Sequence, residues 1–284
     1  MIHKLRITCL AILILVGSMT SAAALTVSFF EEFPNTTTVN KLELIEFDTR
    51  IYVAAKSLAE FQIYENEYKS SNAQVTEVIY WPVLEKEEGY WFSPWSERES
   101  LERIFSEIKN RENTNKLEVL LDLEPSLNRA RLFNFQDFKH NKIKIEEFIS
   151  KAEEYNMSIL TVEKSYIPDW LLERLGLSFS PEKYGNRKIK MYYSSYRRKF
   201  RPNFIVENLL EKKVKKYAEQ GISLGLGLIA PGIHEEKHRV SPRELEQEIK
   251  IASSYGIEEV IIFRLEGLTE EYRDSIKNAE EDTT

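Results

Sequence analysis

Two carboxylates at the end of one apolar segment are the residues of this chain best suited to acid–base chemistry. The segment 117–125 reads Leu-Glu-Val-Leu-Leu-Asp-Leu-Glu-Pro and is typical of a buried β-strand that stops at proline. Side chains alternate along a strand, so Leu120, Asp122 and Glu124 share one face, while the other face is apolar and must be covered by helices. Burying two acids without a role is costly, so we expect a functional site at this strand end.

Strand and helix patterns alternate along the rest of the chain. The expected strands are 25–30, 51–55, 76–83, 117–123, 158–163, 189–194, 222–229 and 259–265. Helices are expected at 37–47, 58–68, 96–109, 145–155, 168–175, 204–220, 241–255 and 270–278, with a long connection over 126–141. Eight alternations predict a single closed (β/α)8 barrel of the TIM type over 25–284. The alternative is an open doubly wound sheet, which would normally show a glycine-rich phosphate loop that this chain lacks.

The same alternation assigns further charged residues to the mouth of the barrel, at the carboxyl ends of the strands. They are Glu32, Glu163, Arg264 and Glu266. Acids that converge in one cleft raise each other's pKa, which is how a general acid arises beside an ionised partner. Alternatively, two or three of them pair with Arg264 or Lys164 and only hold the rim together. Glu31 adjoins Glu32, and a register error of one residue would exchange the two.

Three of the four tryptophans lie at the end of strand 76–83 or in the loop after it: Trp81, Trp91 and Trp95. Aromatic rings match the flat C–H faces of sugars, and carboxylates match their hydroxyls, so this combination favours carbohydrate binding. Trp81 is the preferred platform. The alternative for Trp91 and Trp95 is a small core that packs the loop over the barrel, and Tyr80 should face outward with Val78.

The first 24 residues are typical of a secretory signal peptide. Lys4 and Arg6 precede an apolar run over 7–19, and small residues at 22–24 suit cleavage; an uncleaved N-terminal anchor is the alternative. Cys9 lies in this segment, so the remaining chain has no disulfide, thiolate nucleophile or cysteine metal ligand. We expect a secreted or extracytoplasmic protein with no membrane span after cleavage.

The formal net charge of -7 argues against nucleic acid as a partner. One basic cluster, 197–201, either is a solvated face or marks one rim of a site, and the cluster at 212–216 suits a solvated helix face. No cofactor or metal is expected, because no P-loop, Gly-x-Ser-x-Gly or His-Glu-x-x-His motif is present. His234 and His238 could join acids as metal ligands, although a solvated loop is the simpler interpretation.

These features resemble the barrel glycoside hydrolases. The Asp122-Leu-Glu124 ending is similar to the end of the chitinase-type signature Asp-Gly-x-Asp-x-Asp-x-Glu, whose other positions here hold Leu117, Glu118 and Leu120. Many retaining barrel hydrolases place an acid/base after strand four and a nucleophile after strand seven. The resemblance therefore implies the acid/base role for Glu124, whereas the expected seventh strand ends in Leu-Ile-Ala-Pro without a carboxylate.

The leading hypothesis is a secreted glycoside hydrolase with a glycan as its ligand. Glu124 would be the general acid, Asp122 would tune it, and Glu163, or otherwise Glu32 or Glu266, would activate water or attack the sugar. The residues expected to bind substrate are Glu32, Trp81, Trp91, Trp95, Arg264 and Glu266. One alternative is a non-catalytic extracellular carbohydrate-binding barrel. Another is a metal-dependent sugar isomerase or hydrolase using Asp122, Glu124, Glu163 and His234.

Overall fold

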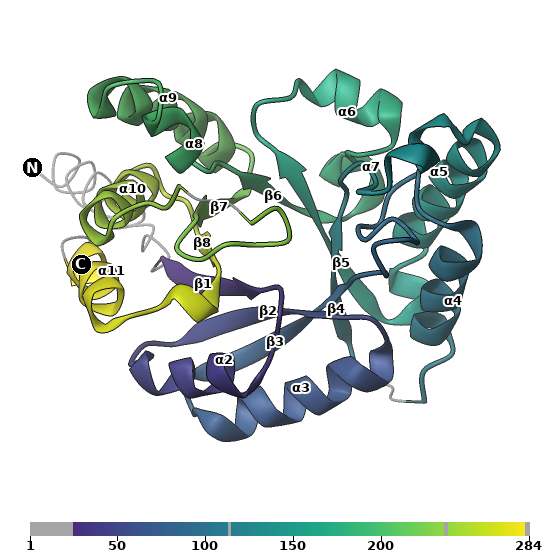
Figure 1. Ribbon diagram of the computed structural model, residues 1–284, viewed down its shortest axis with the longest axis horizontal. Helices are drawn as coiled ribbons and strands as arrows, with labels where there is room; N and C mark the ends of the chain where they lie inside the picture. Colours follow the sequence, from purple (N-terminus) through teal and green to yellow (C-terminus); the bar gives the residue numbers. More distant parts are fainter. Residues whose placement is uncertain (1–24, 113–114, 236–237, 282–284) are drawn as a thin grey trace, which may run out of the picture.

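Eight parallel strands close into one barrel in the computed structural model, which describes residues 25–112, 115–235 and 238–281 (Figure 1). The predicted signal peptide, 1–24, lies outside the described residues. Each strand pairs with the next in sequence, and β8 closes the barrel onto β1, with Val27 opposite Val260. The predicted (β/α)8 barrel is therefore confirmed. The strands are β1 Thr26–Glu31, β2 Thr49–Ala55, β3 Val75–Pro82, β4 Leu117–Asp122, β5 Met157–Lys164, β6 Arg187–Met191, β7 Ser223–Gly227 and β8 Glu259–Phe263.

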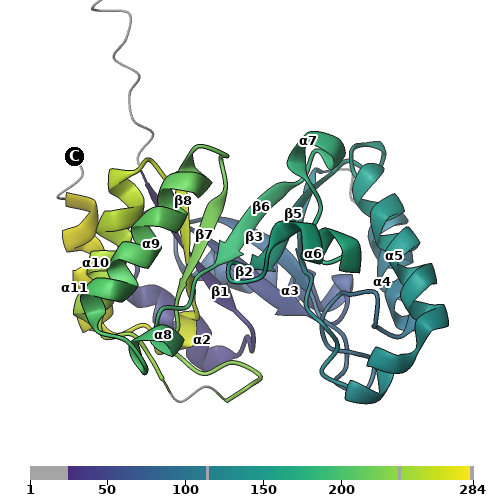
Figure 2. The ribbon, with the colours of Figure 1, turned by 90° about the horizontal axis from the view of Figure 1, so that it is seen from above.

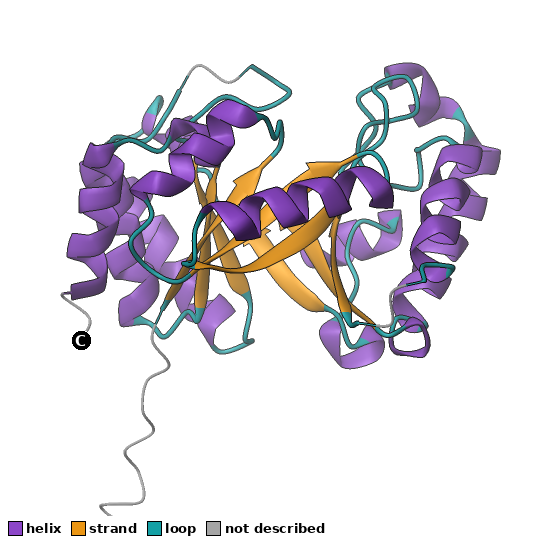
Figure 3. Cartoon of the chain, turned by 90° about the horizontal axis from the view of Figure 1, so that it is seen from below, coloured by secondary structure: helices purple, strands orange, loops and turns teal. Residues whose placement is uncertain are grey.

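Helices surround the strands, as Figures 2 and 3 show from two sides. They are α2 Thr36–Asn40, α3 Leu58–Ser71, α4 Arg98–Lys109, α5 Phe135–Ser150, α6 Asp169–Leu175, α7 Pro181–Tyr184, α8 Ser195–Arg198, α9 Asn203–Ala218, α10 Pro242–Ser254 and α11 Glu270–Glu281. None of these helices combines the length and apolarity required to cross a membrane. Capping explains several starts: Ser57 caps α3, and Ser241 with Glu244 forms a capping box at α10.

Two hydrophobic layers hold the barrel together. The outer layer lies between the strands and the helices and includes Val27, Phe29, Val119 and Leu121. The inner layer fills the barrel with side chains from the opposite strand faces: Phe30, Tyr52, Ile79, Leu120, Leu160, Ile189 and Ile261. Because alternate residues of each strand serve different layers, the parity of a strand decides which polar side chains reach the mouth.

The predicted parity is correct for β1 and β4 but wrong for β5 and β8. In β5, Val162 faces the barrel interior, so Glu163 faces the helices. In β8, Ile261 and Phe263 face inward, whereas Val260 and Ile262 belong to the outer layer. The physical reason is that β8 is apolar on both faces, while the outward acid of β5 is compensated by lysines of β6.

Three local expectations also differ from the structure. Helix α5 begins at Phe135, inside the segment expected to be a connection, because Asn134 accepts a hydrogen bond from the Asp137 amide and caps it. Strand β6 ends at Met191 instead of Ser194, since the short helix α8 starts at Ser195. Helix α4 begins at Arg98, two residues later than the expected start at 96, with Glu97 at its N-cap position. The Ser96 hydroxyl instead donates to the Trp91 carbonyl at 2.7 Å.

The amino-terminal end of the barrel is filled by an ion cluster centred on Arg50. Its guanidinium is 2.7 Å from Glu77, 3.1 Å from Glu259 and in contact with Glu118, so one side chain of β2 connects β3, β4 and β8. Tyr52 also donates to Glu259 at 2.9 Å. This end of the barrel is closed, and the opposite end is the one available for a site.

Candidate active site

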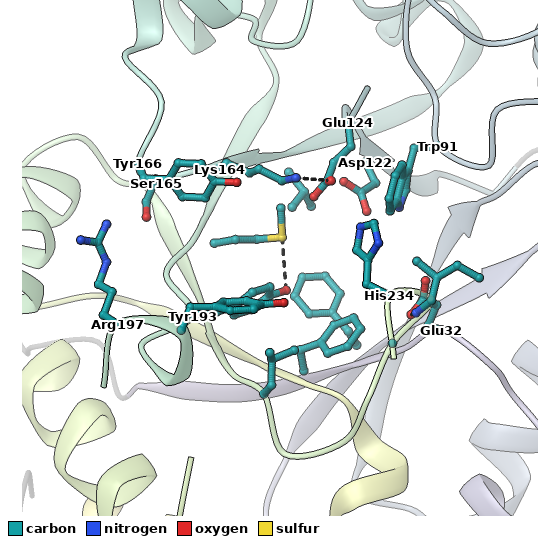
Figure 4. Close-up of a pocket in the computed structure, with 18 of the residues that line it drawn as sticks. Glu32, Trp91, Asp122, Glu124, Lys164, Ser165, Tyr166, Tyr193, Arg197 and His234 are labelled. Atoms are coloured by element: carbon teal, nitrogen blue, oxygen red, sulfur yellow. Dashed lines mark hydrogen bonds and ion pairs between the residues drawn. The ribbon is translucent and has the colours of Figure 1, made fainter. Parts of the chain in front are cut away.

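A cavity of about 600 Å³ opens at the carboxyl ends of the strands (Figure 4). Its charged and polar lining residues are Glu32, Asp122, Glu124, Lys164, Ser165, Arg197, Arg201 and His234. Its aromatic lining residues are Phe30, Trp81, Trp91, Tyr166, Tyr193, Tyr196, Phe200 and Phe263. The size and the mixture of apolar wall with few polar groups are those of a small-molecule or oligosaccharide site.

Asp122 and Glu124 both line this cavity from the end of β4, as their strand parity predicts. Asp122 is 6% exposed, and its Oδ1 atom has no hydrogen-bond partner among the described residues. Burial raises the pKa of Asp122 well above its ordinary value, and the Glu124 charge raises it further, whereas Lys164 lowers it. The site therefore favours the protonated form of this carboxyl group.

Glu124 is held by Lys164, whose Nζ atom lies 2.5 Å from its Oε2 atom. Lys164 ends β5 and points into the cavity because it shares the inward parity of Val162. Burial works against the charge of Lys164, but the Glu124 carboxylate outweighs it and the pKa of Lys164 is raised. The pair fixes the direction of Glu124 and places a cation beside the two acids of β4.

Glu32 brings a third carboxylate to the cavity from the end of β1. The Tyr90 hydroxyl donates to its Oε1 at 2.8 Å, and the Ile233 amide donates to its Oε2 at 3.0 Å. Gly232 makes this approach possible, because a Cβ atom there would lie 2.6 Å from Oε2 of Glu32. The loops after β3 and β7 thus position the side chain of the residue that follows β1.

Two of the three predicted tryptophans lie at the cavity. Trp81 and Trp91 are part of its wall, and the Trp91 ring lies 5.3 Å from that of His234 between centroids. Trp95 is not among the lining residues. Its ring packs on Phe138, 5.0 Å between centroids, at the edge of the outer hydrophobic layer. The small-core alternative therefore describes Trp95, and Tyr80 faces outward as expected, stacked on Phe61.

Arg264 and Glu266, predicted to line the mouth, do not line the cavity. The Arg264 guanidinium lies 2.6 Å from Glu31, contacts Glu266 and sits 4.8 Å above the Phe33 ring. Burial raises the pKa of Glu31, although Arg264 opposes this. Arg264 and Glu266 lie outside the cavity because the parity of β8 is the reverse of the predicted one. The alternative that acids of the mouth pair with Arg264 and hold the rim together therefore holds for Glu266. The register question is also resolved, since Glu32 and not Glu31 reaches the cavity.

Glu163, the preferred second carboxylate, lies outside the cavity. Its carboxylate is 2.6 Å from Lys190 and 3.3 Å from Lys188, both on β6, and Lys190 also contacts Asp169 of α6 at 2.6 Å. The ligand set suggested for a metal is therefore not assembled, although His234 does reach the cavity. Among the described residues, no group of three or more histidine, cysteine, aspartate or glutamate side chains could hold a metal ion.

Several lining residues were missed in the sequence. The sequence indicates Lys164 only as a rim partner, whereas the observed parity of β5 places it in the cavity. Tyr193 was assigned to a strand that ends two residues earlier; its hydroxyl contacts the Met191 sulfur at 3.2 Å. Arg197 and Arg201 belong to the basic cluster whose role the sequence left open.

Comparison with known protein families and with characterised proteins gave no match. The backbone is similar to active domain 2 of a chitinase from Pyrococcus furiosus, with a TM-score of 0.53, 10% identity and coverage of 91% of this chain and 95% of that one. It is also similar to a GH5-4 broad-specificity endoglucanase from Clostridium acetobutylicum, with a TM-score of 0.53 and 11% identity; the alignment covers 94% of this chain and 100% of that one. A D-tagatose 3-epimerase-like protein is similar with a TM-score of 0.50 and 12% identity; the alignment covers 91% of this chain and 98% of that one. At these identities the likeness is one of fold, shared by glycoside hydrolases and sugar epimerase-like proteins.

Proposed function

We propose that this barrel is a glycoside hydrolase whose acid–base pair is Asp122 and Glu124. The observation that carries the proposal is the buried Asp122 carboxyl, unpartnered at Oδ1, beside Glu124 in a cavity walled by tryptophans. An acid kept protonated next to an ionised acid is the arrangement that glycosidic bond cleavage requires. The chitinase and endoglucanase folds support the proposal, and the sequence of residues 1–24 supports an extracytoplasmic location.

The pair and Glu32 divide the chemistry. A proton held by the buried Asp122 carboxyl can pass to the neighbouring Glu124 carboxylate, which then donates it to the leaving glycosidic oxygen. Lys164 keeps Glu124 oriented toward the cavity. Glu32, fixed by Tyr90 and the Ile233 amide, is the third carboxylate among the described lining residues, and it can activate water or attack the sugar. Trp81 and Trp91 offer apolar faces to the sugar rings.

The test is hydrolysis of a glycan panel by the parent protein and by Glu124→Gln. The variant should retain the fold and bind sugar, but turnover should drop about 10²-fold or more, the scale of lost general acid catalysis. Glu266→Gln is the matched control, because this carboxylate pairs with Arg264 outside the cavity, and its turnover should remain near that of the parent. A hydrolase that keeps full activity as Glu124→Gln contradicts the assignment.

A non-catalytic carbohydrate-binding barrel is the second candidate, favoured by the Lys164–Glu124 ion pair. A carboxylate held by an ammonium group can serve as a fixed hydrogen-bond acceptor for sugar hydroxyls. In that case the parent would cleave no member of the panel, and Glu124→Gln would lose sugar affinity. The two candidates therefore give opposite results in the same pair of measurements.

A further inference from the structure

The segment after β6 places two arginines on the cavity wall. Arg197 and Arg201 both line the cavity, and Figure 4 shows Arg197 on the side away from Glu32 and His234. Neither guanidinium forms an ion pair with a carboxylate among the described residues. The Arg197 guanidinium lies over the Tyr192 ring, with its Cζ atom 5.2 Å from the ring centroid. Two cationic forks are thus available to a ligand.

The neighbouring Arg198 shows that this availability is specific to the two cavity arginines. Arg198 points away from the cavity, with Nη2 2.9 Å from Glu248 and Nη1 3.6 Å from Glu244, both on α10. Its side chain is only 9% exposed. The Ser194 hydroxyl also donates to Glu248. The basic cluster is therefore divided: Arg198 anchors the segment on α10, and the anchored segment presents Arg197 and Arg201 to the cavity.

Exposed aromatic rings accompany the two arginines. Tyr166, Tyr196 and Phe200 line the same cavity and are 63%, 45% and 77% exposed. Large exposed aromatic side chains gathered at a pocket mark a binding surface. A ring that stacks on a sugar face, next to a guanidinium that reaches its substituent, is suited to a charged sugar.

The charges of the cavity lining indicate which substituent a bound sugar would carry. The whole chain carries a net charge of -7, so a cationic wall inside its cavity is a local feature. Lys164 is neutralised by Glu124, so among the lining residues that the structure describes Arg197 and Arg201 are the cations without an ion pair. Guanidinium groups bind carboxylate and sulfate oxygens through paired N–H donors. We propose that the glycan bound in this cavity bears acidic groups, carboxylates or sulfate esters, recognised by Arg197 and Arg201; this rests on the proposed function.

The experiment measures the affinity of three tetrasaccharides for the full chain carrying Glu32→Gln, which removes the proposed nucleophile or base and keeps the Lys164–Glu124 ion pair intact. One ligand is neutral, one contains uronic acids and one is sulfated, so the arms distinguish the two acidic chemistries. At least one acidic ligand should bind about tenfold more tightly than the neutral one, the scale of charged hydrogen bonds at a partly exposed site. Added salt should weaken only the acidic complex.

Substitutions then assign the preference to the two arginines. Adding Arg197→Gln and Arg201→Gln should abolish the preference for the acidic ligand, and the corresponding lysine variants should restore part of it. Arg174→Gln, an exposed arginine of α6 outside the cavity, is the matched control. Melting curves verify that each variant is folded.

Equal affinity for all three tetrasaccharides, no binding of any, or a preference that survives the double arginine substitution overturns the inference. The proposed function fails separately. Arginine-dependent binding of an acidic glycan that the parent never cleaves refutes hydrolysis but keeps acidic-glycan recognition. Cleavage of neutral glycans by a protein that shows no preference for acidic ones keeps the proposed hydrolysis but refutes acidic-glycan recognition.

Discussion

Asp122 is the residue where stability and function conflict most directly. Its carboxyl is buried at the inner end of the cavity, its Oδ1 atom has no partner among the described residues, and Glu124 lies close enough to raise its pKa. A buried polar atom left without a hydrogen bond costs stability, typically about 1–3 kcal/mol. A position that bears this cost in a cavity is a functional candidate on physical grounds alone.

Asp122→Asn should therefore make the protein more stable and less active. The raised pKa means that the favourable neutral carboxyl is fully present below its ordinary pKa and is lost as the pH rises through the folded-state value. Asparagine remains neutral throughout, so its advantage over the parent should grow with pH and exceed about 1 kcal/mol at pH 8. Urea unfolding at pH 5 and pH 8 measures this difference.

The same variant should shift the pH profile of hydrolysis and lower turnover less than Glu124→Gln, because Glu124 still faces the substrate. An advantage of Asp122→Asn that is equal at both pH values would contradict the raised pKa of Asp122. A pH profile identical to that of the parent would remove Asp122 from the acid–base pair.

Among the elements, the strands could be predicted from the sequence more fully than their orientation. Leu120, Asp122 and Glu124 alternate with apolar residues, so the inward face of β4 was readable, and Glu32 followed from β1 in the same way. The four apolar residues Val260–Phe263 of β8 carry no such signal, and Arg264 was consequently misplaced. The outward face of β5 could not be recognised, because an acid near a strand end is typical of a mouth residue. Glu163 is instead compensated by a buried ion pair with Lys190 of β6, which the sequence does not reveal.

The loop after β3 contains both a cavity residue and a packing residue. Trp91 lines the cavity, whereas Trp95, four residues later, packs on Phe138 of α5. The turn between them is fixed by the Ser96 hydroxyl, which donates to the Trp91 carbonyl and accepts from the Ser93 amide. Sequence alone could not separate the two roles, since both rings belong to one short aromatic run.

Trp91→Ala and Trp95→Ala should therefore have different effects. Trp91→Ala should weaken oligosaccharide binding about tenfold or more through the lost stacking surface. Trp95→Ala should leave affinity unchanged and lower the free energy of unfolding by about 2–3 kcal/mol, because it removes a packed ring from a partly exposed position. Calorimetric binding and urea unfolding of both variants separate these outcomes; reduced affinity in Trp95→Ala would assign that ring to the site.

At the scale of the whole molecule, the stabilising ion cluster lies at one end of the barrel and the candidate site lies at the other. The Arg50 cluster ties four strands at the amino-terminal end, while the carboxyl-terminal end holds the cavity with its unpartnered Asp122 oxygen. This division is general for TIM barrels and follows from chain geometry, because every strand-to-helix loop emerges at the same end. The eightfold alternation of the sequence was sufficient to predict it, whereas the centre of the ion cluster was not predicted.

Arg50→Gln should destabilise the protein strongly without altering the cavity. The substitution leaves Glu77, Glu118 and Glu259 without their common cation, and removing one partner of a largely buried ion cluster costs about 3–5 kcal/mol.

Lys56→Gln is the control, since its ion pair with Glu85 is about half exposed on both sides and is worth at most about 1 kcal/mol. Urea unfolding and glycan affinity, both measured at pH 7, test the two parts of this prediction. A small loss at pH 7 would show that the cluster does not close the barrel, and a reduced affinity in a folded variant would show that the two ends are coupled.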